Sequence, residues 1–181
     1  MSGRTVALIR GINVGRAKRV AMADLRALAE SVGHGDVRTL LNSGNIVFRA
    51  SGVSPDDAAA RIEEALGARL GVSARVMALS AEALTVVVAE NPLLEVAGNP
   101  SRLMVSFLLD PADRLKLVPL EEQDWTPEVL ALGARVAYLW CPEGLRASPL
   151  TKAVGRALGD AVTTRNWSTV QKLHAIAQDQ P

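Results

Sequence analysis

The sequence predicts an α+β protein in which residues 1–80 form one βαββαβ unit of the ferredoxin-like type. Short apolar runs typical of strands alternate there with two segments of helical periodicity, in the order strand, helix, strand, strand, helix, strand. The turn-forming run Asn-Ser-Gly-Asn at 42–45 separates the two central strand-like runs and predicts a hairpin. Two right-handed crossovers place both helices on one face of a four-stranded antiparallel sheet.

The first elements of this unit are a strand, a basic loop and a helix. Residues 5–14 open as a short β-branched apolar run, which is typical of a buried strand, and 11–20 form a basic loop that contains glycine. Residues 22–32 are expected to be a helix that Gly33 ends. The apolar positions that recur on one face of this helix are Leu25, Leu28, Ala29 and Val32.

The hairpin and the second helix complete the unit. Strands are expected at 37–41 and 46–50, on either side of the turn. Ser54 has the features of a helix cap, since proline and two aspartates follow it, and Gly71 ends the helix. A fourth strand is expected at 74–79.

The second half repeats this order without sequence identity. We therefore predict a second, degenerate ferredoxin-like half, with the chain divided into a subdomain at 1–80, a helix and linker at 81–100, and an α+β subdomain at 101–181. The expected elements are a helix at 81–90, a strand at 102–109, an acidic, proline-punctuated stretch at 110–127, a hairpin of 129–132 with 135–140, a helix from Ser148-Pro149 to Leu158, and a last helix at 165–178 capped by Thr163 or Thr164. The last helix carries the stripe Trp167, Val170, Leu173 and 176–177, and Trp167 is expected in the core.

Composition narrows the class of protein. Of the 181 residues 49% are hydrophobic and only 3% aromatic, so the core is built from aliphatic side chains. The net charge of +1 gives no overall attraction to nucleic acid or membrane. However, residues 1–23 carry five cations and no acid, and 144–174 carry five cations against one acid. The lone Cys141 excludes an internal disulfide, and the N-terminal apolar run is too short for a signal peptide, so we expect a cytoplasmic protein.

The sequence lacks the common catalytic and cofactor motifs. It has no phosphate-binding P-loop, no dinucleotide-binding glycine motif and no nucleophile elbow, and it predicts no cofactor. Two histidines and one cysteine are too few for a zinc site of ordinary spacing, so no metal site is expected. His34 lies in a helix-to-strand turn without the partners of a catalytic triad, and Cys141 is interpreted as a buried structural thiol.

The first candidate site is the glycine loop, residues 10–20. Gly11 and Gly15 let backbone N–H groups approach an anion closely, Asn13 adds an amide, and Arg10 and Lys18 add positive charge. The alternative interpretation is a flexible surface loop whose glycines serve turns.

Two further segments offer polar groups at the ends of elements. Ser43 and Asn45 present a hydroxyl and an amide at the hairpin tip, although a tight turn favours the same residues. Arg165 and Asn166 are expected as exposed residues in the first turn of the last helix, where free N–H groups attract anions. The alternative there is a capped helix that only anchors Trp167.

Together these segments resemble a known protein family. The run Val-Ala-Leu-Ile-Arg-Gly-Ile-Asn-Val-Gly at 6–15, Met-Ala-Asp-Leu at 22–25, Ser-Gly-Asn at 43–45 and Thr-Thr-Arg-Asn-Trp at 163–167 closely resemble the bacterial domain of unknown function 1697 family. The resemblance implies ferredoxin-like subdomains and supplies no catalytic residues. The chain departs from the family pattern at Arg16, where a second glycine is usual, and at Ser168, where asparagine is usual.

These observations favour a binding site for a small anionic or phosphorylated ligand between the two halves. The expected ligand-binding residues are Arg10, Gly11, Asn13, Gly15, Lys18, Ser43, Asn45, Arg165 and Asn166. Whether a reaction follows binding is left open, as is the oligomeric state. A nucleic-acid-binding or regulatory module is the alternative, but a ferredoxin-like sheet binds RNA through exposed strand aromatics, and the first four strands supply only Phe48. A protein–protein adaptor has only the charge asymmetry in its favour.

Overall fold

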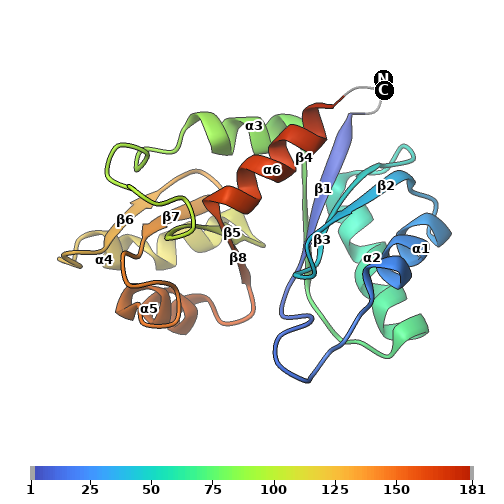
Figure 1. The fold of residues 1–181 in the computed structure, drawn as a ribbon, viewed down its shortest axis with the longest axis horizontal. Helices are drawn as coiled ribbons and strands as arrows, with labels where there is room; N and C mark the ends of the chain where they lie inside the picture. Colours follow the sequence, from blue (N-terminus) through green and yellow to red (C-terminus); the bar gives the residue numbers. More distant parts are fainter. Residues whose placement is uncertain (1–2, 180–181) are drawn as a thin grey trace. The chain divides into compact units, whose positions relative to one another are not determined.

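The computed structural model describes residues 3–179 and divides the chain into two compact units. Within the described residues, unit 1 comprises 3–85 and 173–179, and unit 2 comprises 86–172. Each unit contains one four-stranded antiparallel sheet (Figure 1). None of the helices within residues 3–179 combines the length and the apolar composition that a membrane crossing requires.

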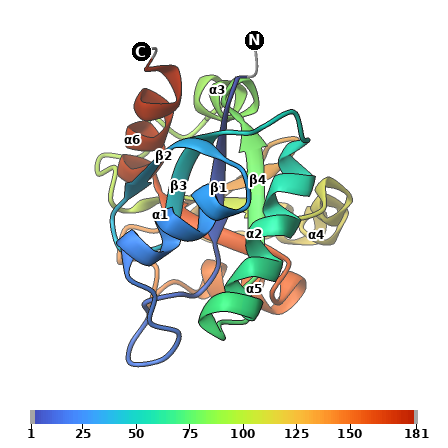
Figure 2. The same cartoon turned by 90° about the vertical axis from the view of Figure 1, so that its right-hand side faces the viewer.

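Unit 1 has the predicted βαββαβ arrangement. Its elements in chain order are β1 (Arg4–Ile9), α1 (Met22–Ser31), β2 (Gly35–Leu40), β3 (Asn45–Arg49), α2 (Pro55–Leu70), β4 (Val76–Ser80) and the start of α3 (Ala81–Ala89). The strand order β2-β3-β1-β4 is that of a ferredoxin-like sheet. Helices α1 and α2 cover one face of this sheet, as Figure 2 shows.

The helices of unit 1 begin and end where the sequence indicates. The Ser54 hydroxyl accepts a hydrogen bond from the Asp57 N–H at 3.1 Å, and Gly71 ends α2 in the left-handed conformation. Alternate residues of the strands pack against the helices to form the core. Its buried members include Ala7, Ile9, Ile46, Phe48, Leu25, Leu28, Ile62 and Leu66.

The first strand is shorter than predicted. The sequence predicts a strand over 5–14, whereas β1 ends at Ile9. The backbone leaves the strand conformation because φ is positive at Gly11, Asn13 and Gly15. The glycine loop therefore starts directly at the end of β1.

Unit 2 repeats the arrangement with the strand order β6-β7-β5-β8. The chain thus contains two ferredoxin-like halves, as the sequence predicts. Its elements are β5 (Leu103–Leu108), the 3-10 helix η1 (Pro111–Lys116), α4 (Val118–Glu121), β6 (Val129–Leu132), β7 (Val136–Trp140), α5 (Pro149–Leu158), β8 (Val162–Asn166) and the start of α6 (Trp167–Gln178). In the acidic stretch at 110–127, the short helices η1 and α4 replace the single longer helix that α1 provides in unit 1. This half is therefore a degenerate version of the arrangement.

The largest difference between prediction and structure concerns the last helix. Residues 162–166 form strand β8, which pairs with β5 from Leu108↔Val162 to Met104↔Asn166, and α6 begins only at Trp167. Strand pairing prevails because Val162, Thr163 and Thr164 are β-branched and supply the hydrogen-bonding partner that the edge of β5 needs. The cap is Asn166, whose Oδ1 accepts from the Thr169 N–H at 2.9 Å, and not Thr163 or Thr164.

Candidate functional site

The glycine loop has an unusual backbone. The angle φ is positive at Gly11, Asn13 and Gly15 and negative at Ile12 and Val14 between them, so its sign alternates along five residues. Successive N–H groups converge when neighbouring residues have opposite handedness, and such concavities bind anions. Within residues 3–179, no hydrogen bond takes up the N–H groups of Val14 and Gly15. The loop therefore has the alternating sign of φ that such concavities require.

Asn13 fixes the shape of this loop through its side chain. Its Nδ2 donates to the carbonyls of Val20 and Asn42, both at 2.8 Å, and its Oδ1 accepts from the Val20 N–H at 2.9 Å. The Asn13 N–H also donates to the Lys18 carbonyl at 3.0 Å. Both hydrogens of the amide group are thus used inside the protein. Asn13 therefore has a structural role in the loop, and its contact with a ligand stays a prediction.

The structure brings the glycine loop and the hairpin turn together. Besides the bond from Asn13 to Asn42, the Ile9 N–H donates to the Gly44 carbonyl at 2.8 Å. Asn45 is fully buried in β3, and its Nδ2 donates to the Leu40 carbonyl and to the Ser43 hydroxyl, both at 2.9 Å. Ser43 and Asn45 therefore stabilise the turn to which Asn13 of the glycine loop is hydrogen-bonded.

Arg165 and Asn166 do not lie in the first turn of a helix, contrary to the sequence prediction. Arg165 belongs to β8 and is nine-tenths buried, so burial lowers its pKa to about 10. Its Nη1 donates to the Thr163 hydroxyl and to the Thr164 carbonyl, both at 2.9 Å. The Asn166 side chain caps α6. The expectation of an exposed cation at 165 is therefore wrong, because a strand and not a helix holds this residue.

The nine predicted ligand residues are thus divided between the units. Unit 1 holds Arg10, Gly11, Asn13, Gly15, Lys18, Ser43 and Asn45, and unit 2 holds Arg165 and Asn166. Within the described part of the chain, no three His, Cys, Asp or Glu side chains gather in a way that could hold a metal ion.

His34 and Phe48 stack on each other in the core of unit 1. Their ring centroids are 4.3 Å apart, and both side chains are buried. Phe48 belongs to the core under the helices, so its ring offers no exposed platform on which a base could stack. This placement counts against the nucleic-acid alternative.

Burial also governs the two other titratable candidates. Desolvation raises the pKa of the Cys141 thiol to about 11, so the reactive thiolate is scarce at neutral pH and the interpretation as a buried structural thiol is confirmed. Desolvation, reinforced by Arg61, lowers the pKa of His34.

The low pKa of His34 predicts a loss of stability in acid. As the pH falls below about 6.5, His34 becomes protonated in the unfolded chain while it stays neutral in the folded protein. The free energy of unfolding therefore decreases, by at most about 1.4 kcal/mol per pH unit. Denaturant unfolding at pH 7.5 and pH 5 should show a larger decrease in the wild type than in His34→Phe, which keeps a ring against Phe48. His174→Gln, which removes the other histidine of the sequence, serves as the control variant. Equal pH dependence in wild type and His34→Phe would contradict the assignment.

Comparison with known proteins places the chain in a family. The family model described as "Protein of unknown function (DUF1697)" matches residues 2–138, which is more than half of the chain. The chain belongs to this family. The glycine loop and the hairpin turn lie inside the matched DUF1697 region, whereas β8 and the Thr-Thr-Arg-Asn-Trp run follow it.

A solved structure supports the fold of this DUF1697 protein. The conserved bacterial protein SP0830 from Streptococcus pneumoniae matches with a TM-score of 0.79 and 23% sequence identity, over 97% of this chain and 98% of that chain. At this identity the likeness shows the shared fold alone. No curated protein matches the sequence.

Proposed function

We propose that the glycine loop of this DUF1697 protein binds a small anionic or phosphorylated ligand. The observation that carries the proposal is the alternating sign of φ from Gly11 to Gly15, together with the unused N–H groups of Val14 and Gly15. A backbone concavity of this kind binds an anion without any conserved catalytic side chain.

Charge and rigidity support the same function. The exposed cations Arg16, Lys18 and Arg19 follow the concavity, and no acidic residue occurs before Asp24. Asn13 ties the loop to the hairpin turn, so the loop is ordered before a ligand arrives. The participation of Arg165 and Asn166 in the same site stays a prediction from the sequence.

A ligand screen tests this function. Phosphate-bearing metabolites should raise the melting temperature, because a ligand that binds only the folded state stabilises it by mass action. Lys18→Gly removes one cation and suits the positive φ of 50° at this position, so it should weaken binding by roughly tenfold or more without straining the loop. Arg26→Ala, which removes an exposed cation of α1, is the matched control and should bind like the wild type.

The same screen distinguishes a small-ligand site from a nucleic-acid-binding module. A nucleic-acid module binds single-stranded oligonucleotides with an affinity that falls steeply with salt, and no single cation is decisive. Submicromolar oligonucleotide binding at physiological salt, without a response to any metabolite, would reverse the proposal.

A further inference from the structure

A second group of cations gathers on unit 1, at the opposite end of β1 from the glycine loop. Arg4 at the start of β1 and Arg49 at the end of β3 are directly paired across the two strands. Arg38 on β2 pairs with Val47, which is two residues from Arg49, so all three arginines lie on the same face of the sheet. This is the face opposite α1 and α2, because the helix-facing residues of β1 and β3 are Ala7, Ile9, Ile46 and Phe48.

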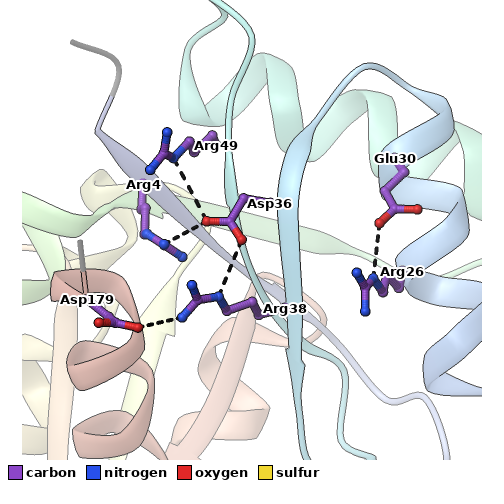
Figure 3. A network of polar contacts seen from close by, with 7 residues as sticks. All are labelled: Arg4, Arg26, Glu30, Asp36, Arg38, Arg49 and Asp179. Atoms are coloured by element: carbon purple, nitrogen blue, oxygen red, sulfur yellow. Dashed lines mark hydrogen bonds and ion pairs between the residues drawn. The ribbon is translucent and has the colours of Figure 1, made fainter. Parts of the chain in front are cut away.

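One carboxylate holds the three arginines together. Figure 3 shows the three arginine side chains directed at Asp36. The Asp36 carboxylate lies 2.7 Å from Nη2 of Arg4, 3.4 Å from Nε of Arg38 and 3.9 Å from Nε of Arg49. A bulge in β2 between Gly35 and Arg38 carries Asp36, whose φ is +47°. Bulges of this kind redirect a side chain out of the regular ladder. Asp36 is therefore a positioning residue for the cations.

A second carboxylate, that of Asp179 near the end of the chain, forms an ion pair with Arg38. Oδ2 of Asp179, which follows α6, lies 2.7 Å from Nη1 of Arg38 (Figure 3). Arg38 and Arg4 together lower the pKa of Asp179. The Asp179 side chain is 59% exposed, so solvent and solutes reach this ion pair.

We propose that Arg4, Arg38 and Arg49 form a binding site for the dianionic phosphate of a phosphate monoester, with Asp179 occupying the place of that phosphate in the free protein. Three guanidinium groups and Asp36 carry a net charge of +2. A phosphate monoester carries about −1.5 to −2 at pH 7 and neutralises this charge, whereas the single negative charge of Asp179 leaves one positive charge uncompensated.

The geometry of the arginines fits such a ligand. The Arg4 side chain is only 5% exposed, and within residues 3–179 its Nη1 has no hydrogen-bond partner, so a buried positive charge lies at the base of the site. Arg38 and Arg49 are 38% and 44% exposed and form its rim. Planar guanidinium groups bind phosphate oxygens through paired N–H donors, which explains the use of arginine at all three positions.

Titration with inorganic phosphate and phenyl phosphate, followed by 31P nuclear magnetic resonance at constant ionic strength, tests the site. Both should bind saturably, and acetate added as a competitor should displace them only weakly. Arg38→Ala should weaken binding at least tenfold. Asp179→Asn should tighten it by up to about fivefold, since it removes a competing exposed ion pair. If Arg38→Ala fails to fold, Arg49→Gln takes its place with the same expected loss.

Two matched controls make the result specific. Arg26→Ala removes an arginine that pairs with Glu30 on α1 and should leave binding unchanged (Figure 3). Lys18→Gly alters the glycine loop and should leave unchanged the component of phosphate binding that Arg38→Ala removes. Binding that survives Arg38→Ala but is lost in Lys18→Gly would place the anion at the glycine loop and overturn the second site. Absence of saturable binding in both wild type and Asp179→Asn, or equal binding of acetate and phosphate, would also overturn it.

Discussion

Trp167→Ala should lower the free energy of unfolding by about 3–5 kcal/mol, which is the usual cost of truncating a buried aromatic side chain to alanine. Trp167 is the first residue of α6 and is only 4% exposed. It shares the buried stripe of α6 with Val170, Leu173 and Ala177, whereas Ile176, expected in the same stripe, is only half-buried. Loss of the indole leaves a cavity that the surrounding strands and helix cannot fill.

Thermal and denaturant unfolding measure this loss. The melting temperature should fall by roughly 2–4 °C for each kcal/mol. Trp167→Phe keeps most of the apolar volume and should cost clearly less than the alanine variant, so it serves as the matched control. An unfolding midpoint that is unchanged in Trp167→Ala would contradict the buried position of the ring.

Gly44→Ala should destabilise the protein by about 2–5 kcal/mol, because two separate costs add at this position. The φ of Gly44 is +81°, a conformation that alanine adopts only with strain. A Cβ atom there would also lie 2.9 Å from Cδ1 and Cγ1 of Ile12 and 3.0 Å from Cβ of Ile9. Ile12 and Ile9 are both buried in the core of unit 1, so a shift of either side chain disturbs packed neighbours.

Gly11→Ala separates the two costs. Gly11 has a similar φ of +71°, but an added Cβ meets no atom within 4 Å, so only the backbone strain of about 1–2 kcal/mol is expected. Both variants are measured by denaturant unfolding. Equal losses in the two variants would show that the hairpin turn does not press against the glycine loop. A larger loss in Gly44→Ala would confirm that the turn and the loop are packed as one unit.

Signals that act over a few residues were sufficient to predict much of the fold. Ser54 and Ser148 cap α2 and α5 as predicted, because a serine hydroxyl and a following proline act within one helical turn. The hairpin turns at 41–44 and at Gly133 lie where glycine and asparagine interrupt the apolar runs. The order of strands and helices in unit 1 follows from these local signals and from the right-handed crossover rule.

The tertiary structure decided what depends on pairing between distant segments. Residues 162–166 became a strand because β5 supplies hydrogen-bonding partners about 60 positions earlier in the chain, and helical periodicity cannot report that pairing. The same pairing buries Arg165, which the sequence alone suggests is exposed.

The two candidate sites also differ in whether they depend on neighbouring residues or on distant segments. Clustered cations and glycines identify the glycine loop directly in the sequence, because all of its residues are neighbours in the chain. Asn13 could not be recognised as a structural residue, since its partner Asn42 lies 29 residues away. The arginine site was missed for the same reason: Arg4, Asp36, Arg38, Arg49 and Asp179 meet only when three strands pair in register and the end of α6 reaches the sheet. The glycine loop could therefore be predicted from local composition. The arginine site could not, because it depends on strand register, which is set by packing across the whole sheet.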